Sequence, residues 1–119
     1  MARPVPSAAL QAFDVVVVPF PFTDRLASKR RPAVVLSSPA FHQDTRHAVL
    51  AMITSAEQSA WAGDCAIHDL PAAGLPSPCL ARLKLFTLDN RLIIRVCGRL
   101  AAADQRRVRS AWKGLLTAF

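Results

Sequence analysis

Short apolar runs of strand length, separated by polar or proline-containing stretches, constrain the fold of this chain more than any other feature. The first run spans residues 13–20 and is ended by two prolines. Runs at 32–38 and 47–55 repeat the pattern, and the last of them ends in two hydroxyl residues. The polar, basic stretch 23–31 between the first two is expected to be an exposed loop. The β-branched composition predicts three buried strands, with the first two antiparallel.

The second half of the chain continues with strands and then changes to helical spacing. A short strand is expected at 64–70, and strands with strict alternation at 80–88 and 94–100. In the strand at 94–100 one face is apolar and the other carries arginines. A C-terminal helix is indicated by apolar residues spaced i, i+4, i+7 and i+8, namely Val108, Trp112, Leu115 and Leu116.

These elements amount to about five or six strands and one helix. Helices do not alternate with the strands, so a parallel sheet with crossover helices is disfavoured. The predicted fold is mainly β, a small, partly closed antiparallel barrel capped by the C-terminal helix. A chain of 119 residues, 52% of them hydrophobic, can build one core. We therefore expect a loose leader at 1–12 and a single domain at 13–119.

The cysteines and the apolar segments indicate the compartment. Three cysteines, without metal-ligand spacing, predict free apolar thiols and a reducing, cytoplasmic setting. The most apolar stretch, residues 15–22, contains two prolines and is too short to span a bilayer. The N-terminus lacks the apolar core of a signal peptide. A cytoplasmic protein without membrane association is expected.

The charge balance points to a polyanionic partner. The chain has 15 Lys and Arg against 8 Asp and Glu, a net charge of +7, and twelve of the basic residues are arginine. The planar guanidinium fork suits phosphates and carboxylates. The acids are scattered rather than paired, which disfavours a two-metal nuclease, and common nucleotide-binding and zinc motifs are absent. Neither a metal nor a cofactor is expected.

Arg31, Thr54 and Ser55 are the candidate phosphate-binding residues. Arg31 precedes Pro32 at the entry of the second strand, and the two hydroxyls end the third strand. If these strands are neighbours, a guanidinium and two hydroxyls can converge on one phosphate. The commoner alternative is a solvated arginine and hydroxyls that bond to the local backbone.

Further cations and aromatic residues form a candidate surface for nucleic acid. Arg82 and Lys84 are spaced about 7 Å apart along one strand face, close to the spacing of phosphates in a single strand. Lys29 and Arg30 lie in the basic loop, and Phe20 and Phe22, beside Pro19 and Pro21, can stack unpaired bases. The alternatives are a solvated sheet face for the cations and core packing for the aromatic rings.

Two histidines and two tryptophans leave several interpretations open. His42 or His47 can act as a general base, although a loop histidine without a mechanistic role is more frequent. Trp61 is either an interface residue or a stacking residue, whereas Trp112 is expected on the core face of the helix.

Taken together in order, several sequence blocks resemble the PemK/MazF toxins. The blocks cover roughly residues 13–116 and comprise 13–24, 29–37, 52–55, 73–78, 82–89 and 94–100. The resemblance implies an SH3-like, CcdB/PemK-type barrel that forms a homodimer. It also implies a metal-independent, sequence-selective endoribonuclease that cuts single-stranded mRNA. Attack by the 2′-OH of the RNA would leave a 2′,3′-cyclic phosphate and a 5′-OH, and would inhibit translation and growth.

The resemblance assigns roles to residues of this chain. The catalytic arginine of the family corresponds to Arg31 and its strand-end threonine to Thr54, with Ser55 beside it. Arg82 and Lys84 correspond to the lining of the RNA groove. Some members carry an acid beside the equivalent of Arg82, proposed as the general base, and this chain has none there. The base is left open among four residues, His42, His47, Asp24 and Glu57.

The resemblance also implies partners. Such toxins are neutralised by an antitoxin whose disordered acidic tail fills the RNA groove, and the complex binds promoter DNA mainly through the antitoxin. Two alternatives on the same fold are a non-catalytic gyrase poison similar to CcdB and a basic nucleic-acid-binding adaptor. RNA cleavage separates the toxin ribonuclease from both alternatives.

Overall fold

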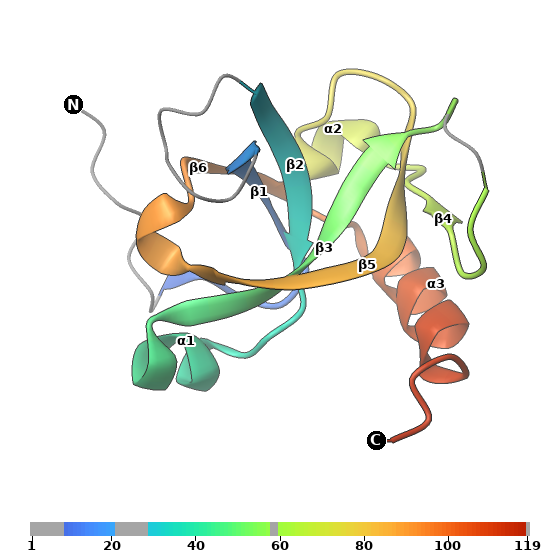
Figure 1. Ribbon diagram of the computed structural model, residues 1–119. Coiled ribbons are helices and arrows are strands. Elements are labelled where there is room, and N and C mark those ends of the chain that lie inside the picture. Colours follow the sequence, from blue (N-terminus) through green and yellow to red (C-terminus); the bar gives the residue numbers. More distant parts are fainter. Residues whose placement is uncertain (1–8, 21–28, 58–59, 119) are drawn as a thin grey trace.

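A curled antiparallel sheet of six strands forms the body of the protein (Figure 1). The computed structural model describes residues 9–20, 29–57 and 60–118. The strands lie in the order β4-β5-β3-β2-β1-β6, so the sheet forms a half-barrel. The strands are β1 (Asp14–Phe20), β2 (Lys29–Val35), β3 (His47–Ser55), β4 (Cys65–Ala66), β5 (Cys79–Asp89) and β6 (Arg95–Arg99). The predicted mainly-β barrel is confirmed.

The helices lie at the margins of the sheet. They are α1 (Pro39–Thr45), α2 (Leu70–Ala73), the short 3₁₀ helix η2 (Asn90–Leu92) and the C-terminal α3 (Ala102–Lys113). Helix α1 contacts β3, α2 contacts β6, and α3 contacts β4 (Figure 1). The predicted C-terminal helix is confirmed, with Val108 and Trp112 buried as expected, but α3 ends at Lys113, so Leu115 and Leu116 lie beyond it and Leu115 is 45% exposed. Among the described residues, no helix has the length and apolar character needed to cross a membrane.

Three local features differ from what the sequence predicted. Residues 29–31 belong to β2 rather than to a loop, because they pair with the end of β1 from Val18 to Phe20. The segment 64–70 forms only the two-residue strand β4 before α2 begins. Helix α1 was not expected, although Ser38 and Pro39 mark its start: the Ser38 hydroxyl accepts the Phe41 N–H, and Pro39 occupies the first turn.

Both faces of the sheet are buried, which explains the unbroken apolar runs in β1 and β3. Val15 and Val34 pack with Trp112 of α3 in one cluster. Val16 and Val18 pack in a second cluster, which contains Leu10 from the segment before β1. Successive side chains of a strand point to opposite faces, so a strand buried on both faces is apolar throughout.

A bulge in β5 breaks the strict alternation expected for residues 80–88. Ala51 of β3 pairs with Leu85, but Ile53 pairs with Ala81, so β5 contributes two more residues than β3 over this interval. As a result, the consecutive residues Ala81 and Arg82 are both buried. Bulges re-aim side chains beside functional sites. This one places Arg82 and Lys84 next to the end of β3.

A second irregularity, between Val15 and Val16, shifts the pairing of β1 with β6. Val96, expected on the apolar face of its strand, is 41% exposed as a consequence.

Gly74 ends α2 in the left-handed region at a φ of 71°. A Cβ atom there would lie 2.0 Å from the carbonyl oxygen of Cys97. This close approach directs the chain into the loop 75–78, which forms one wall of the site described next.

Candidate functional site

Two adjoining hollows open where β2 begins and β3 ends, and they share Arg31, Ile53 and Thr54. The Lys84 hollow has a volume of about 160 Å³ and is lined by Phe20, Arg31, Met52, Ile53, Thr54, Arg82 and Lys84. The Ser77 hollow has a volume of about 230 Å³ and is lined by Arg31, Pro32, Ile53, Thr54, Ser55, Leu75, Pro76, Ser77, Pro78 and Cys79. A guanidinium and a hydroxyl therefore stand where the two hollows meet.

The strand register explains how Arg31 and Thr54 come together. Ala33 of β2 pairs with Met52 of β3, and Val34 pairs with Ala51. The β2–β3 pairs stop at Ala33 and Met52, and the same register continued by two residues sets Arg31 opposite Thr54, in agreement with their shared place in both hollows. The predicted neighbourhood of the second and third strands is confirmed. The Arg31 guanidinium also lies 5.1 Å from the ring centroid of Phe20, which is close enough for a cation–π contact.

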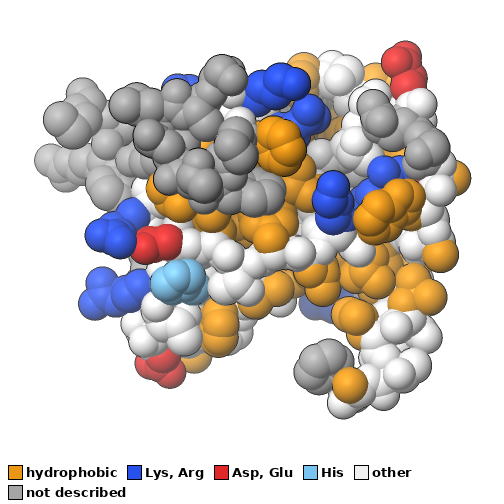
Figure 2. Space-filling view, in the orientation of Figure 1, with side chains coloured by type: hydrophobic (Ala, Val, Ile, Leu, Met, Phe, Trp, Pro, Cys, Tyr) orange, Lys and Arg blue, Asp and Glu red, His pale blue; other side chains and the backbone are white. Residues whose placement is uncertain are grey.

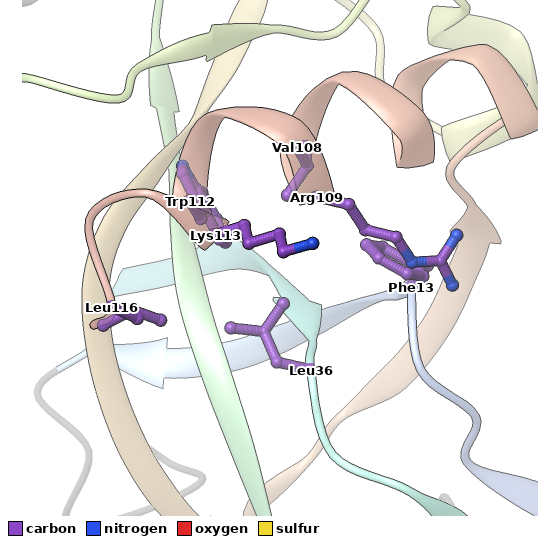
Figure 3. A pocket seen from close by; sticks show the side chains of 7 residues that line it. All are labelled: Phe13, Leu36, Val108, Arg109, Trp112, Lys113 and Leu116. Carbon is purple, nitrogen blue, oxygen red and sulfur yellow. The ribbon is translucent and has the colours of Figure 1, made fainter. Parts of the chain in front are cut away.

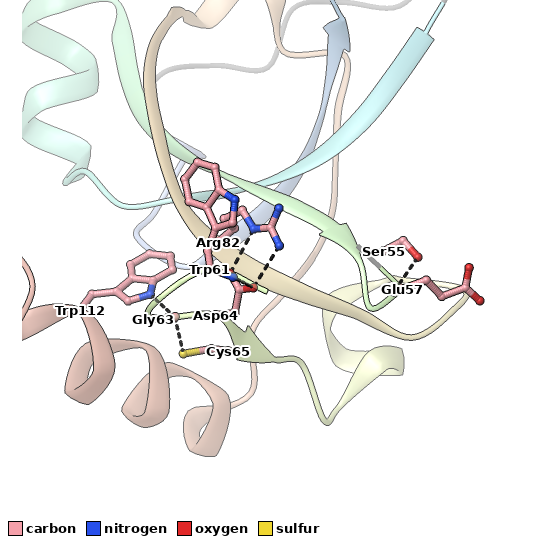
Figure 4. A network of polar contacts seen from close by, with 8 residues as sticks. All are labelled: Ser55, Glu57, Trp61, Gly63, Asp64, Cys65, Arg82 and Trp112. Carbon is pink, nitrogen blue, oxygen red and sulfur yellow. Dashed lines mark hydrogen bonds and ion pairs between the residues drawn. The ribbon is translucent and has the colours of Figure 1, made fainter. Parts of the chain in front are cut away.

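Ser55 lies at the exposed end of β3 and lines only the Ser77 hollow. Its Oγ accepts a hydrogen bond of 3.3 Å from the backbone N–H of Glu57. The Glu57 side chain is exposed, and its carboxylate points away from Ser55 (Figure 4). The serine hydroxyl is thus partly engaged by the turn that follows β3, whereas Thr54 stands between the two hollows.

Arg82 is held by a carboxylate rather than standing free on the sheet face. Its Nε donates to Oδ1 of Asp64 at 3.1 Å, and its Nη2 donates to Oδ2 at 3.0 Å (Figure 4). The guanidinium holds the pKa of Asp64 below its usual range, chiefly through this hydrogen bonding. Arg82 is only 8% exposed. The sequence prediction treated Arg82 as an exposed groove cation, and it missed Asp64 because 18 residues separate the two.

The other predicted RNA-binding residues differ in position. Lys84 is exposed and lines the hollow that we name after it. Lys29 and Arg30 are exposed on β2 but line neither hollow. Phe22 lies outside the described residues. Phe20, the other aromatic residue that the sequence suggested for stacking, is half-buried and lines the Lys84 hollow.

The histidines proposed as bases lie elsewhere. His47 begins β3, at the opposite end of that strand from Thr54. His42 is fully buried, with Nε2 2.7 Å from Ser37 Oγ and Nδ1 3.2 Å from the Leu10 carbonyl oxygen. The Leu10 carbonyl oxygen can only accept, so Nδ1 donates to it, and Nε2 of the neutral imidazole accepts the Ser37 hydroxyl proton while Ser37 Oγ accepts the Val49 N–H. His42 therefore ties the segment before β1 to the sheet.

Among the described lining residues of the two hollows, none is a ready general acid or base. The residues that the structure shows lining them include neither a histidine nor a carboxylate, and Asp24 lies outside the described residues. Cys79 lines the Ser77 hollow, where burial raises the pKa of its thiol. Within the described ranges, no cluster of three or more His, Cys, Asp or Glu could hold a metal ion.

Comparison with known proteins identifies the family. PemK-like, MazF-like toxins of type II toxin–antitoxin systems match residues 11–116. The chain belongs to this family. A search of curated proteins found no match to the toxin.

Solved structures agree in fold. The toxin superposes on a MazE–MazF complex from Deinococcus radiodurans with a TM-score of 0.69 and 21% identity, over 91% of this chain and 95% of that one. It superposes equally on a mycobacterial endoribonuclease in complex with its cognate antitoxin, with a TM-score of 0.69, 15% identity, and coverage of 91% and 93%. MazF from Deinococcus radiodurans gives 0.67, 24% identity, and coverage of 90% and 96%. The predicted PemK/MazF resemblance is confirmed.

Basic side chains gather on the surface of the toxin around the Lys84 hollow and the Ser77 hollow (Figure 2). Figure 2 shows Lys and Arg gathered over the start of β2 and over β3 and β5, beside hydrophobic side chains. A third hollow, of about 440 Å³, lies beside α3 and is mainly apolar, with Arg109 and Lys113 at its rim (Figure 3). It shares no lining residue with the Lys84 hollow or the Ser77 hollow.

Proposed function

We propose that the toxin is an endoribonuclease that cleaves single-stranded RNA at a phosphate held between Arg31 and Thr54. The observation that carries this proposal is that both residues line both hollows. A phosphate bound there would have room on either side for the nucleotides that flank it. Arginine offers a planar set of donors to phosphoryl oxygens, and threonine adds a neutral donor.

In this proposal the RNA supplies its own nucleophile. The 2′-oxygen attacks the adjacent phosphorus, the bond from phosphorus to the 5′-oxygen breaks, and the products are a 2′,3′-cyclic phosphate and a 5′-OH end. Negative charge grows on the phosphoryl oxygens during this displacement. Arg31 stabilises that charge, and the Thr54 hydroxyl donates to one of the oxygens.

Two protons move in the reaction. The 2′-OH loses one as it attacks, and the departing 5′-oxygen gains one. Because the described linings offer neither a histidine nor a carboxylate, we assign both transfers to water or to groups outside these linings: one accepts the 2′-OH proton, and one donates a proton to the departing 5′-oxygen. An arginine is a poor proton donor, so Arg31 is assigned to charge stabilisation rather than to general acid catalysis.

The decisive experiment is cleavage of a long, mixed-sequence RNA by the purified protein in excess EDTA. We expect fragments that carry 2′,3′-cyclic phosphate and 5′-OH ends, at a rate unaffected by the chelator. Arg31→Ala is the matched control for a contaminating nuclease, since it should remove the activity from an otherwise identical preparation. Intact RNA, activity abolished by EDTA, or 5′-phosphate ends would each contradict the mechanism.

We further propose that an acidic antitoxin competes with RNA for this surface, in the cytoplasm, and that the toxin acts as a homodimer. Two of the similar structures are complexes with an antitoxin. A net charge of +7 favours either polyanion. Promoter DNA would bind only through the toxin–antitoxin complex. Light scattering of the purified chain tests the dimer, and displacement of bound RNA by the antitoxin encoded beside it tests the competition.

A further inference from the structure

Trp61 is a large aromatic side chain that is unusually exposed and at the same time held in a fixed turn. The residue is 46% exposed. Its backbone N–H donates to Asp64 Oδ2 at 2.8 Å, and its carbonyl oxygen accepts the Asp64 N–H at 3.2 Å. These two bonds use only backbone atoms of Trp61. The position of the indole is therefore fixed by a turn that does not depend on the side chain it presents.

The indole also rests on a fixed cation. The Arg82 guanidinium carbon lies 5.0 Å from the ring centroid, and the same guanidinium is held by both oxygens of Asp64 (Figure 4). Arg82 in turn lines the Lys84 hollow. Asp64 holds Arg82, and Arg82 contacts the indole. The exposed ring of Trp61 therefore lies at the margin of the Lys84 hollow, which also contains Arg31 and Thr54.

We propose that Trp61 is a stacking platform for one unpaired base of the bound RNA, a base-binding subsite beside the proposed cleavage site. The inference rests on the proposed function, because the RNA that crosses Arg31 and Thr54 is the strand whose base would reach Trp61. Every base has an aromatic face, so a fixed indole can bind a neighbouring nucleotide without reading its identity. Lys84, exposed on the same hollow, supplies a cation for the adjoining phosphate.

The local charge favours a base over an acidic peptide at this subsite. Asp64 already satisfies the charge of Arg82, and their side chains are only 12% and 10% exposed. The indole of Trp61 is a flat, apolar surface that lies over the ion pair of Arg82 and Asp64. A carboxylate gains little from such a surface, whereas a planar base gains stacking contact over its whole face.

The test measures binding of fully 2′-O-methylated oligonucleotides, which lack the attacking hydroxyl and remain intact. Four homopolymers, one for each base, are titrated into wild type, Trp61→Phe and Trp61→Leu. We expect the leucine variant to bind about tenfold more weakly, and the phenylalanine variant to retain most of the affinity. Phe41→Leu is the matched control: Phe41 is 38% exposed on α1, away from both hollows, and its replacement should leave binding unchanged.

Tryptophan fluorescence and cleavage kinetics also test the role of the Trp61 ring. Oligonucleotide binding should quench wild-type tryptophan emission, and quenching should vanish in Trp61→Phe, because the remaining Trp112 is only 4% exposed. On cleavable RNA, Trp61→Leu should raise KM about tenfold with kcat nearly unchanged, as expected for a contact away from the reacting atoms. A ring that merely stabilised the fold would shift the unfolding temperature instead.

The outcomes separate the two proposals. Equal affinities of wild type and Trp61→Leu, or equal weakening of the phenylalanine and leucine variants, would overturn the platform even if the protein cleaves RNA. Wild type that binds and is quenched but leaves cleavable RNA intact would overturn the proposed function and leave the platform in place. Absence of oligonucleotide binding by wild type would overturn both. Weakened binding of an acidic peptide alone would reassign Trp61 to that partner.

Discussion

The guanidinium of Arg82 meets the carboxylate of Asp64 through two parallel hydrogen bonds of 3.1 and 3.0 Å, across 18 residues of sequence. Both side chains are largely buried. The pair joins β5 to the turn before β4, and its guanidinium lies 5.0 Å from the ring centroid of Trp61. Arg82, expected to be an exposed cation of the groove, is therefore a buried residue that holds neighbouring side chains in place.

Asp64→Asn should therefore destabilise the protein. The amide keeps the shape of the side chain but removes the charge that neutralises Arg82, which leaves a mostly buried cation with a weaker partner. We expect a loss of about 2 kcal/mol in the free energy of unfolding. Urea denaturation measures it, with Asp44→Asn on the exposed face of α1 as the control. Identical midpoints for Asp64→Asn and wild type would show that the pair contributes no net stability.

Lys84 and Arg82 should differ in their effect on the salt dependence of RNA binding. Lys84 is exposed and forms no ion pair with the residues that the structure describes, whereas Arg82 pairs with Asp64. Lys84→Gln should reduce the slope of log K against log salt by about 0.7, the value for one phosphate contact on a single strand. The paired replacement Arg82→Gln with Asp64→Asn conserves net charge and should leave the slope unchanged. Equal slopes for Lys84→Gln and wild type would remove Lys84 from the groove.

The sequence predicted those features of the fold that depend on local pattern. The β-branched runs predicted β1 and β3, and helical spacing predicted α3. The places of Arg31 beside Pro32 and of Thr54 at a strand end brought the two residues together as candidates, and both line the two hollows. Local pattern is sufficient for these features because each depends on residues within one strand or helix.

The features that could not be predicted depend on pairing between distant segments. The burial of Arg82 follows from a bulge in β5 opposite Met52 and from an acid on another loop, and neither leaves a periodic signal in the sequence. The exposure of Val96 similarly follows from the shifted pairing of β1 with β6. The start of α1 was different: Ser38 followed by Pro39 is a local signal that could have been used.

Acid should weaken the attachment of α3 to the rest of the protein. Asp104 is buried, and its carboxylate accepts the N–H groups of His68 and Asp69 at 3.1 and 3.0 Å and pairs with Arg107. Burial by itself raises the pKa of Asp104. The hydrogen bonds and Arg107 together lower this pKa by more than burial raises it, so the net pKa lies below the usual value of 3.8. The folded state therefore keeps this carboxylate ionised at a lower pH than the unfolded state does.

The resulting stabilisation is fully present above pH 3.8 and is lost as the pH falls through the lower, folded-state pKa. Asp104→Asn should thus be less stable than wild type at pH 7, by about 2 kcal/mol, and the difference should shrink below pH 3.8. Urea unfolding of both proteins between pH 7 and pH 2 measures this convergence. Glu57→Gln, an exposed acid, is the control, and a pH-independent difference for Asp104→Asn would contradict the assignment.

Arg31 and Thr54 should control the rate of RNA cleavage without supporting the fold. Arg31→Ala should lower kcat about 10²- to 10³-fold, the loss typical of one group that stabilises transition-state charge. Arg31→Lys should recover part of the rate, because it restores the charge but not the planar fork.

Thr54→Val removes the hydroxyl at nearly constant shape. Ser55→Ala is its matched control, since Ser55 lines only one hollow and its Oγ bonds to the Glu57 N–H. Single-turnover cleavage measures all four variants, and a Thr54→Val rate equal to wild type, with Ser55→Ala impaired, would move the role of the hydroxyl to Ser55.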